Sequence, residues 1–283
     1  MRVGFIGLGA MGKPMARNLA ATDFLYAVWG RNIDDAKIIA SKLGVRCAKS
    51  PSALAKRCDL IITCVSADDD VLDVVRAMLP GLSPGKIVVD TSTVSVTTAK
   101  AAAMVLEDRG TMFLDAPVSG GVEGAKNGTL AMMIGGDEDV LERARPALEV
   151  LSTQIIVMGP TGSGQGTKAV NQAMAAGINQ AVTEALAFAG ELGLPMDKVI
   201  DVISAGAAGN WFLEHRGPNM THAQFEPGFK VGLHHKDLKI CKQMADQKGF
   251  KLPLTEQTIK DYEVLMQEGY GEEDISALYR LKP

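Results

Sequence analysis

The sequence contains no long uninterrupted apolar run and no block of basic residues. The first absence argues against a transmembrane helix, and because an apolar segment follows directly after Met1-Arg2, we expect no signal peptide either. The second absence, with a net charge of −4 at pH 7, argues against nucleic acid as a partner. The cysteines lack the CxxC spacing of metal sites, so we expect reduced thiols of a cytoplasmic protein.

The composition is that of an ordinary globular protein, with 47% hydrophobic and 22% charged residues. A chain of 283 residues accommodates two modest domains. Composition therefore leaves the function to be sought in the motifs.

A glycine motif of the form GxGxxG lies at Gly7-Leu8-Gly9-Ala10-Met11-Gly12, after an apolar strand-like run and before a helical pattern. In this context Gly7 permits a tight turn, Gly9 lets the backbone approach a pyrophosphate, and Gly12 allows the helix to pack closely on the strand. The free amides at the helix start face the phosphates. We therefore predict a dinucleotide site, the alternative being a structural turn that binds nothing.

The end of the second strand-like run, Leu25–Trp29, indicates which dinucleotide is bound. Sites for NAD usually place Asp or Glu here, which accepts hydrogen bonds from the ribose 2′-hydroxyl and repels a 2′-phosphate. This chain has Arg31 and Asn32 instead, and no acid before Asp34. Since arginine suits a phosphate, we predict that NADP(H) is preferred over NAD(H). An Arg31 that is only a solvated turn residue is the alternative.

The first half of the chain alternates apolar strand-like runs with helical patterns. This alternation predicts an α/β fold of the Rossmann type, with a largely parallel sheet covered on both faces. The predicted strands are Val3–Ile6, Leu25–Trp29, Leu60–Val65, Ile87–Asp90, Met112–Asp115, Leu130–Ile134 and Gln154–Met158, and the predicted helices include Met11–Ala21, Ile33–Leu43, Val94–Arg109 and Glu138–Leu151.

The strand pattern stops at the breaker segment Gly159–Gly166, and Thr167–Leu192 is a long alanine-rich helical pattern without proline. Further helical patterns cover Met196–Ser204, Leu233–Lys248, Leu254–Glu268 and Asp274–Leu281. We predict a dinucleotide-binding domain over residues 1–162 and an all-helical domain over residues 163–283, linked by the long helix. Because the second domain is small for an independent core, we expect a homodimer or homotetramer.

Ligands in open α/β sheets bind beyond the carboxyl ends of the strands. Three segments are expected to converge there: Cys64-Val65-Ser66, Asp90–Thr93 and Asp115–Gly121. In the last of them, the Ser119 hydroxyl and the backbone amides of the following glycines suit a small carboxylate. A plain glycine-rich turn explains the same residues.

Lys168 is the strongest candidate for a catalytic group. We place it in the first turn of the long helix, at the joint between the domains, where a partly desolvated lysine can donate a proton to a carbonyl oxygen. Asn171 and Gln172 follow at the spacing that puts side chains on the same helix face. They are positioned to orient a substrate hydroxyl or carbonyl.

A second lysine, Lys236, follows His234 and His235. Adjacent histidines on a helix point in different directions and no third ligand is evident, so we predict no metal. Lys236 either pairs with Asp237 or reaches the cofactor or the substrate carboxylate. Trp211, after a glycine-bearing loop, either covers the cleft or belongs to the core.

Four motifs, in this order, resemble the β-hydroxyacid dehydrogenase family, and the resemblance covers essentially the whole chain. They are Gly7–Gly12, Asp115-Ala116-Pro117-Val118-Ser119-Gly120-Gly121, Gly162-x-Gly164-x-x-x-Lys168 and Lys236-Asp237-Leu238. The family includes 3-hydroxyisobutyrate dehydrogenase, tartronate semialdehyde reductase and glyoxylate/succinic semialdehyde reductase.

The resemblance implies that Lys168 is the general acid in aldehyde reduction and the general base in alcohol oxidation. It also implies a carboxylate site at Ser119, Gly120 and Gly121, substrate contacts from Asn171, Gln172 and Lys236, and cofactor contacts near the nicotinamide from Val65, Ser66, Thr93 and Lys236. Many members have Asn where this chain has Gln172. Gln172 and Phe225-x-Pro227-Gly228-Phe229 are similar to tartronate semialdehyde reductases, whereas the loop Gly206–Trp211 departs from that subgroup.

We therefore expect an NADP-dependent reductase of a small carboxylate-bearing aldehyde such as glyoxylate, succinic semialdehyde or tartronate semialdehyde. The alternatives are a 3-hydroxyisobutyrate-type dehydrogenase working oxidatively, an imine reductase and a non-catalytic cofactor-binding module. Relatives specialised for imines generally lack a lysine at the position of Lys168, and a module that only binds a cofactor needs neither Lys168 nor the segment Ser119–Gly121.

Overall fold

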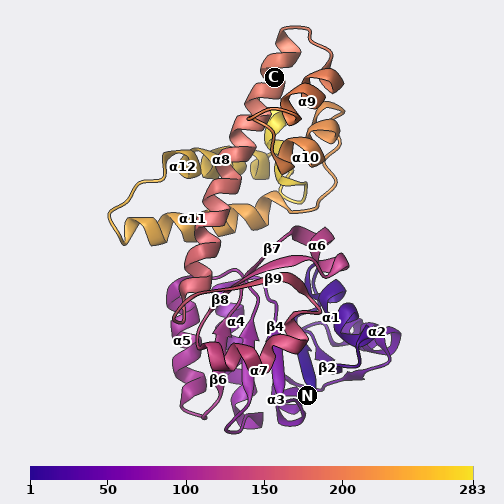
Figure 1. The fold of residues 1–283 in the computed structure, drawn as a ribbon, viewed down its shortest axis with the longest axis vertical. Coiled ribbons are helices and arrows are strands. Elements are labelled where there is room, and N and C mark those ends of the chain that lie inside the picture. Colours follow the sequence, from indigo (N-terminus) through magenta and orange to yellow (C-terminus); the bar gives the residue numbers. More distant parts are fainter. Residues whose placement is uncertain (283) are drawn as a thin grey trace. The chain divides into compact units, whose positions relative to one another are not determined.

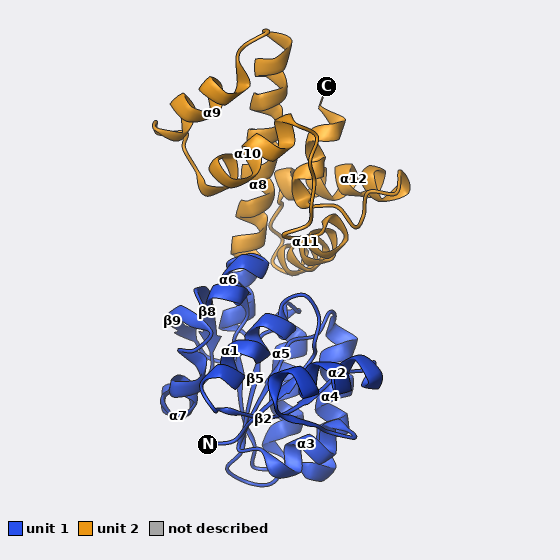
Figure 2. Ribbon diagram, turned by 90° about the vertical axis from the view of Figure 1, so that its right-hand side faces the viewer, with its two compact units in different colours: residues 1–168 blue, residues 169–283 orange. Residues whose placement is uncertain are grey.

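A computed structural model describes residues 1–282 of the chain. They divide into unit 1, Met1–Lys168, and unit 2, which begins at Ala169 (Figure 2). The division falls inside one long helix, α8 (Ser163–Glu191), so the two units share a continuous backbone element. The domain boundary that we place at residues 162 and 163 stays a prediction.

Unit 1 is built on a nine-stranded sheet of order β3-β2-β1-β4-β5-β6-β8-β7, with β9 paired to β8 (Figure 1). Its first six strands pair in parallel, β8 runs antiparallel to β6 and β7, and β9 runs parallel to β8. The strands are β1 (Val3–Ile6), β2 (Leu25–Trp29), β3 (Arg46–Cys47), β4 (Leu60–Thr63), β5 (Ile87–Asp90), β6 (Met112–Asp115), β7 (Val118–Ser119), β8 (Leu130–Gly135) and β9 (Ser152–Gly159). The order 3-2-1-4-5-6 confirms the Rossmann-type fold.

Helices cover both faces of this sheet, as the buried strand residues require. Every residue of β1, β4 and β5 is buried. One apolar core joins the sheet to α1 (Gly12–Ala21), α2 (Ile33–Leu43), α6 (Gly121–Asn127) and α7 (Glu138–Leu148). A second core, on the other face, joins it to α3 (Pro51–Arg57), α4 (Asp68–Met78) and α5 (Val96–Glu107), with a short 3₁₀ turn at Leu79–Gly81.

The strand ends are aligned in one row across the sheet. Ile6 pairs with Thr63, Thr63 with Asp90, Asp90 with Asp115, and Asp115 with Gly135. The segments that follow the parallel strands β1, β4, β5 and β6 therefore leave the sheet at one edge, whereas the antiparallel strand β8 leads away from it. This edge brings the predicted strand-end residues of unit 1 together.

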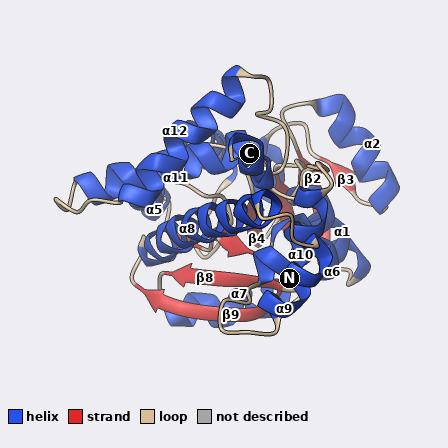
Figure 3. Ribbon diagram, turned by 90° about the horizontal axis from the view of Figure 1, so that it is seen from above, coloured by secondary structure: helices blue, strands red, loops and turns tan. Residues whose placement is uncertain are grey.

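Unit 2 consists of helices around a third apolar core, and the strands of the described chain all belong to unit 1 (Figure 3). It contains most of α8, then α9 (Met196–Ser204), α10 (Trp211–Thr221), α11 (Val231–Asp246), α12 (Pro253–Gln267) and a 3₁₀ segment, Ile275–Leu281. Tyr262, on α12, is among the largest fully buried side chains. None of the helices within residues 1–282 combines the length and the apolar content needed to cross a membrane.

Some predicted boundaries are wrong. The long helix begins at Ser163 rather than Thr167, the strand from Leu60 ends at Thr63 rather than Val65, and the last helix is 3₁₀. The sequence patterns also missed β3, β7, α6 and α10. Two-residue strands show no periodicity, α6 begins at the second of two consecutive glycines, and α10 carries Pro218 in its interior, all of which read as loop signals.

Candidate active site

The glycine turn after β1 leaves room for a ligand at one position only. Gly7 has φ of +100°, and a Cβ there would lie 2.0 Å from the Cys64 carbonyl oxygen. A Cβ on Gly12 would lie 1.8 Å from the Gly7 carbonyl oxygen, whereas a Cβ on Gly9 would meet nothing within 4 Å. Leu8 is buried in the core, Met11 is half-buried and Ala10 is exposed. The turn thus fits a pyrophosphate beside Gly9, with α1 starting behind it.

The end of β2 carries an exposed cation. The Arg31 side chain is 75% exposed, and its Nη1 lies 2.8 Å from Oδ1 of Asp70, in the first turn of α4. Asn32 caps α2, because its side-chain oxygen accepts hydrogen bonds from the amides of Asp34 and Asp35. The guanidinium has five N–H donors, so the single contact with Asp70 leaves capacity for a further anion.

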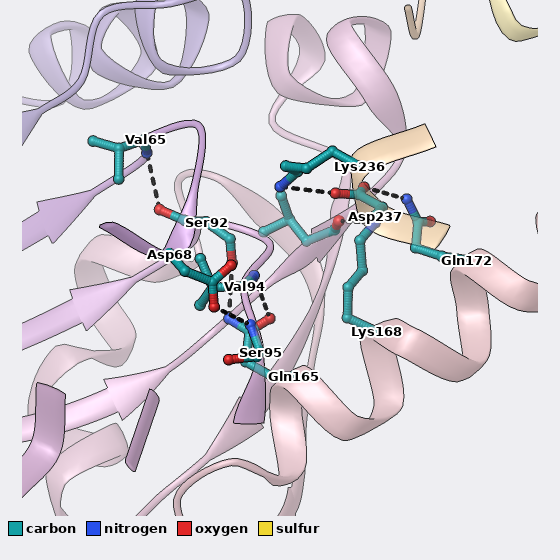
Figure 4. Close-up of polar contacts among 11 residues, drawn as sticks. Val65, Asp68, Ser92, Val94, Ser95, Gln165, Lys168, Gln172, Lys236 and Asp237 are labelled. Carbon is teal, nitrogen blue, oxygen red and sulfur yellow. Dashed lines mark hydrogen bonds and ion pairs between the residues drawn. The ribbon is translucent and has the colours of Figure 1, made fainter. Parts of the chain in front are cut away.

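The ends of β4 and β5 are tied together by buried hydrogen bonds. The Val65 amide donates to Ser92 Oγ at 2.9 Å (Figure 4), and Ser92 Oγ donates to Asp90 Oδ1 at 2.6 Å. Thr63 Oγ1 donates to the same oxygen at 2.7 Å. Thr93 is half-buried, and Ser66 is exposed beyond the strand end. The structure thus brings these predicted residues to one edge of the sheet.

The segment Ser119-Gly120-Gly121 is a turn from a strand into a helix. Ser119 ends β7 and pairs with Ala131, while Gly120 and Gly121 have φ of +125° and +60°, and Gly121 begins α6. Glycine adopts these values without the steric cost of a side chain. Ser119 is half-buried and both glycines are exposed, so the segment is open to a ligand.

Lys168 is buried, with 7% of its surface exposed, and its Nζ donates to the Val118 carbonyl oxygen at 2.8 Å. The sequence predicts Lys168 in the first turn of the long helix. That placement is wrong: α8 begins at Ser163, so Lys168 lies in the second turn. The contact with Val118 places the ammonium one residue before Ser119. Lys168 and the predicted carboxylate site are therefore neighbours within unit 1.

Asp115 ends β6, as predicted, but it makes contacts that the sequence did not reveal. Its side chain is fully buried; Oδ1 accepts from the Gly162 amide at 2.7 Å and Oδ2 from the Gln165 amide at 2.9 Å. Burial raises the pKa of the Asp115 carboxyl, and the two amides partly offset that rise. The carboxylate thus caps α8 from a strand 47 positions earlier, a distance at which no sequence motif for capping exists.

In unit 2 the predicted polar residues form one chain of contacts around Asp237. Gln172 Nε2 donates to Asp237 Oδ2 at 2.6 Å, and Lys236 Nζ lies 2.9 Å from Asp237 Oδ1 (Figure 4). Asn171 Nδ2 donates to Gln172 Oε1 at 2.9 Å. Gln172 and Asp237 are buried, so the amide of Gln172 is held in a fixed orientation.

His234 and His235 are adjacent on α11, and their side chains contact different residues, as predicted for neighbours on a helix. His234 is fully buried, with Nδ1 3.0 Å from the Tyr262 hydroxyl, and burial strongly raises the pKa of that hydroxyl. His235 lies beside Glu263. Within residues 1–282 no group of His, Cys, Asp and Glu side chains could hold a metal ion. Trp211 is 57% exposed and stacks on His215, so it does not belong to the core.

Comparison with known proteins agrees with this arrangement. Residues 2–159 match the model for the NAD binding domain of 6-phosphogluconate dehydrogenase, and residues 162–282 match that for the NAD-binding segment of NADP-dependent 3-hydroxyisobutyrate dehydrogenase. The chain is 36% identical over 279 residues to the 2-hydroxy-3-oxopropionate reductase of Escherichia coli (strain K12), covering 98% of this chain and 96% of that protein.

Two further relatives are similar over the full length. The NAD-dependent L-serine dehydrogenase of Pseudomonas aeruginosa is 32% identical over 292 residues, covering 99% of this chain and 97% of that protein. The solved structure of a Mycobacterium tuberculosis 3-hydroxyisobutyrate dehydrogenase with L-serine superposes with a TM-score of 0.88 at 33% identity, covering 99% of each chain. Matching domains, matching fold and identity above 30% along the whole length show that the chain belongs to the β-hydroxyacid dehydrogenase family of NAD(P)-dependent oxidoreductases.

Proposed function

We propose that the protein reduces a small aldehyde that carries a carboxylate, with Lys168 as the general acid. The observation that supports this most is the buried Lys168 ammonium, which donates to the Val118 carbonyl directly before Ser119. A lysine so placed has an N–H to offer a carbonyl oxygen while its own position is fixed by the backbone.

The reaction needs a hydride donor, which a bound nicotinamide dinucleotide supplies. Ser119 Oγ and the backbone amides of Gly120 and Gly121 hold the substrate carboxylate and so fix the position of the carbonyl. Lys168 Nζ donates a proton to the carbonyl oxygen as the carbonyl carbon gains the hydride, and the neutral amine then takes a proton from water. Positioning of this kind lowers a barrier by roughly 7–11 kcal/mol in favourable cases.

We assign Asn171, Gln172 and Lys236 to the substrate as well. Asn171 and Gln172 follow Lys168 by three and four positions on the unbroken helix α8, and these spacings put side chains on one helix face. Asp237 orients both Gln172 and Lys236. We also assign Lys236, Val65, Ser66 and Thr93 to the cofactor, the last three because they leave the sheet at its ligand-binding edge.

We propose NADP(H) as the preferred cofactor. The support is the exposed Arg31 guanidinium at the end of β2, at the position where a carboxylate would serve the 2′-hydroxyl of NAD. Michaelis constants for both cofactors test this, and a clear preference for NADH contradicts it. The relatives include a protein named as an NAD-dependent dehydrogenase, so the comparison of the two cofactors is necessary.

A second candidate is oxidation of a hydroxy acid by the same residues, with Lys168 accepting the proton. The relatives named as 3-hydroxyisobutyrate and L-serine dehydrogenases favour it. Initial rates with NADP⁺ and each hydroxy acid, compared with the reductive rates at the same pH, decide the preferred direction.

The experiment is NADPH oxidation at neutral pH with glyoxylate, succinic semialdehyde, tartronate semialdehyde and methylmalonate semialdehyde. Lys168→Ala is expected to lower kcat by roughly 10²–10⁴-fold, the usual contribution of a general acid, with NADPH binding unchanged. Lys42→Ala, which removes an exposed lysine of α2, is the control. Near-normal turnover in Lys168→Ala refutes its role. Tight NADPH binding with no rate on any aldehyde shifts the assignment to imines or to a non-catalytic module.

A further inference from the structure

The first turn of α8 is fastened to two strand ends by two buried side chains, Asp115 and Gln165. Asp115 has none of its surface exposed and Gln165 has 1%. All the groups they contact belong to unit 1, as does Lys168. Neither side chain is needed for the proton transfer proposed above, so their polar contacts require another explanation.

The Asp115 carboxylate supplies the negative charge that the start of α8 lacks. The first turn of α8 has no acidic residue, and a helix start attracts negative charge through its unpaired amides. The space around the carboxylate is filled: a Cβ on Gly135 would lie 2.3 Å from Asp115 Oδ1, and a Cβ on Gly164 would lie 2.3 Å from the Met133 carbonyl oxygen. The helix start therefore has one closely packed position against β6 and β8.

The Gln165 amide fastens the same turn to the segment after β5. Its Oε1 accepts from the Val94 amide at 3.1 Å, and its Nε2 donates to the Ser92 carbonyl at 2.8 Å (Figure 4). These two contacts lie on either side of Thr93. Ser92 in turn accepts from the Val65 amide, so the segments after β4 and β5 are both linked to the helix start.

We propose that Asp115 and Gln165 form a clasp that sets the position of Lys168 relative to the segments carrying Val65 and Thr93. Both are positioning residues, and the inference rests on the proposed role of Lys168. Gln165 precedes Lys168 by three positions, less than one helical turn, so a shift of the helix start moves the ammonium with it. Misplacement by 1 Å can cost on the order of 10²-fold in rate.

The test compares variants of Gln165 and Asp115 with one control variant, all in the whole protein. Gln165→Leu removes both contacts with the segment after β5. Asp115→Asn keeps the side-chain shape but turns an amide nitrogen toward one of the two donors. Thr183→Val is the matched control: it removes a buried hydroxyl that bonds backbone carbonyls of α8 in unit 2, about four turns beyond Lys168.

We expect Gln165→Leu and Asp115→Asn each to lower kcat by at least about tenfold while the Kd for NADPH changes by less than about twofold, as for a misplaced catalytic group. Gln165→Glu, which keeps the acceptor for Val94, is expected to lie between wild type and Gln165→Leu. A kcat of Gln165→Leu within about twofold of wild type, or a loss equalled by Thr183→Val, overturns the clasp.

Hydrogen exchange separates failure of the clasp from failure of the proposed function. In Gln165→Leu the Val94 amide is expected to exchange faster than in wild type, and unchanged exchange overturns the clasp whatever the activity. If wild type reduces none of the aldehydes, the proposed function fails. In that case exchange and NADPH binding still test the clasp. If exchange of the Val94 amide is faster in Gln165→Leu but the Kd for NADPH rises above the twofold limit, the inference that the clasp acts on the position of Lys168 is overturned.

Discussion

Individual glycines in the turn after β1 differ in what a methyl group would meet. Gly9→Ala is expected to leave the melting temperature unchanged, because its Cβ meets nothing within 4 Å, yet to weaken NADPH binding by at least about tenfold by occupying the space beside the backbone. Gly12→Ala is expected to destabilise the protein by about 1–3 kcal/mol, because its Cβ would overlap the Gly7 carbonyl oxygen. Thermal melting and calorimetric titration check both. Normal NADPH affinity in Gly9→Ala contradicts the assignment of the turn.

The buried thiol of Cys58 makes the free energy of unfolding depend on pH in the alkaline range. Burial raises the pKa of Cys58 from 9.0 to about 11, with Lys86 and Arg2 opposing the rise. Between these values the unfolded chain releases the thiol proton and the folded protein does not. The unfolded state therefore binds fewer protons, and the free energy of unfolding falls as pH rises through this window.

Urea denaturation at pH 8 and at pH 10.5 measures this fall. Cys58→Ala is expected to lose less stability than wild type between the two pH values. The buried hydroxyl of Tyr262, whose pKa burial also raises, contributes equally to both proteins and cancels in the comparison. An equal fall in the two proteins contradicts the contribution of Cys58.

At the scale of elements, α4 matters because its first turn brings an acid to the proposed 2′-phosphate site. Asp70→Asn removes the carboxylate beside Arg31 and is expected to tighten NADPH binding by about two- to fivefold, the range for an exposed ion pair, without changing NADH binding. Asp73→Asn, which breaks an ion pair with Arg76 on the same helix, is the control. Titrations at low and high salt check the result, since screening weakens the effect. Equal changes for both cofactors argue against a phosphate at Arg31.

The elements that could be predicted have strong local signals. β5 is a continuous run of buried apolar residues that ends at Asp90, and α2 has both its Asn32 cap and a left-handed Gly44 at its end. The start of α8 could not be predicted in the same way. Gly162 and Gly164 read as breakers, but the cap comes from Asp115 and Gly164 fits beneath a carbonyl where no side chain can.

The candidate site was predictable to a similar extent. The sequence predicts Lys168 and Ser119 as site residues, and the structure brings the two together, because the Val118 carbonyl accepts from the lysine. The contribution of Gln165 was not predictable, because its partners Ser92 and Val94 lie 73 and 71 positions earlier in the chain. Contacts at such separations depend on sheet register, which the pattern of a single sequence does not contain.

For the molecule as a whole, the exposed face of α8 supports the expectation of a homo-oligomer. Val170, Met174 and Phe188 are each more than half exposed, at spacings that place them along one side of the helix. Apolar surface of this extent favours burial against a partner, and we expect the partner to be a second copy.

Light scattering after gel filtration tests this expectation. Wild type is expected to elute as a dimer or tetramer, and Phe188→Asp to shift toward the mass of one chain. Phe250→Asp, at an equally exposed phenylalanine after α11, is the control and is expected to keep the wild-type mass. A wild-type mass of one chain contradicts the expectation.

The position at which the chain divides has a consequence for recombining it with its relatives. A chimaera joined at residue 162 or 163 would take Asp115 from one parent and the helix start that it caps from another. A junction placed after Lys168, inside α8, keeps Asp115, Gly162, Gln165 and Lys168 from a single parent. For exchanging substrate preferences between family members, a junction directly after Lys168 is therefore a better crossover point than the glycine-rich segment that looks like a linker.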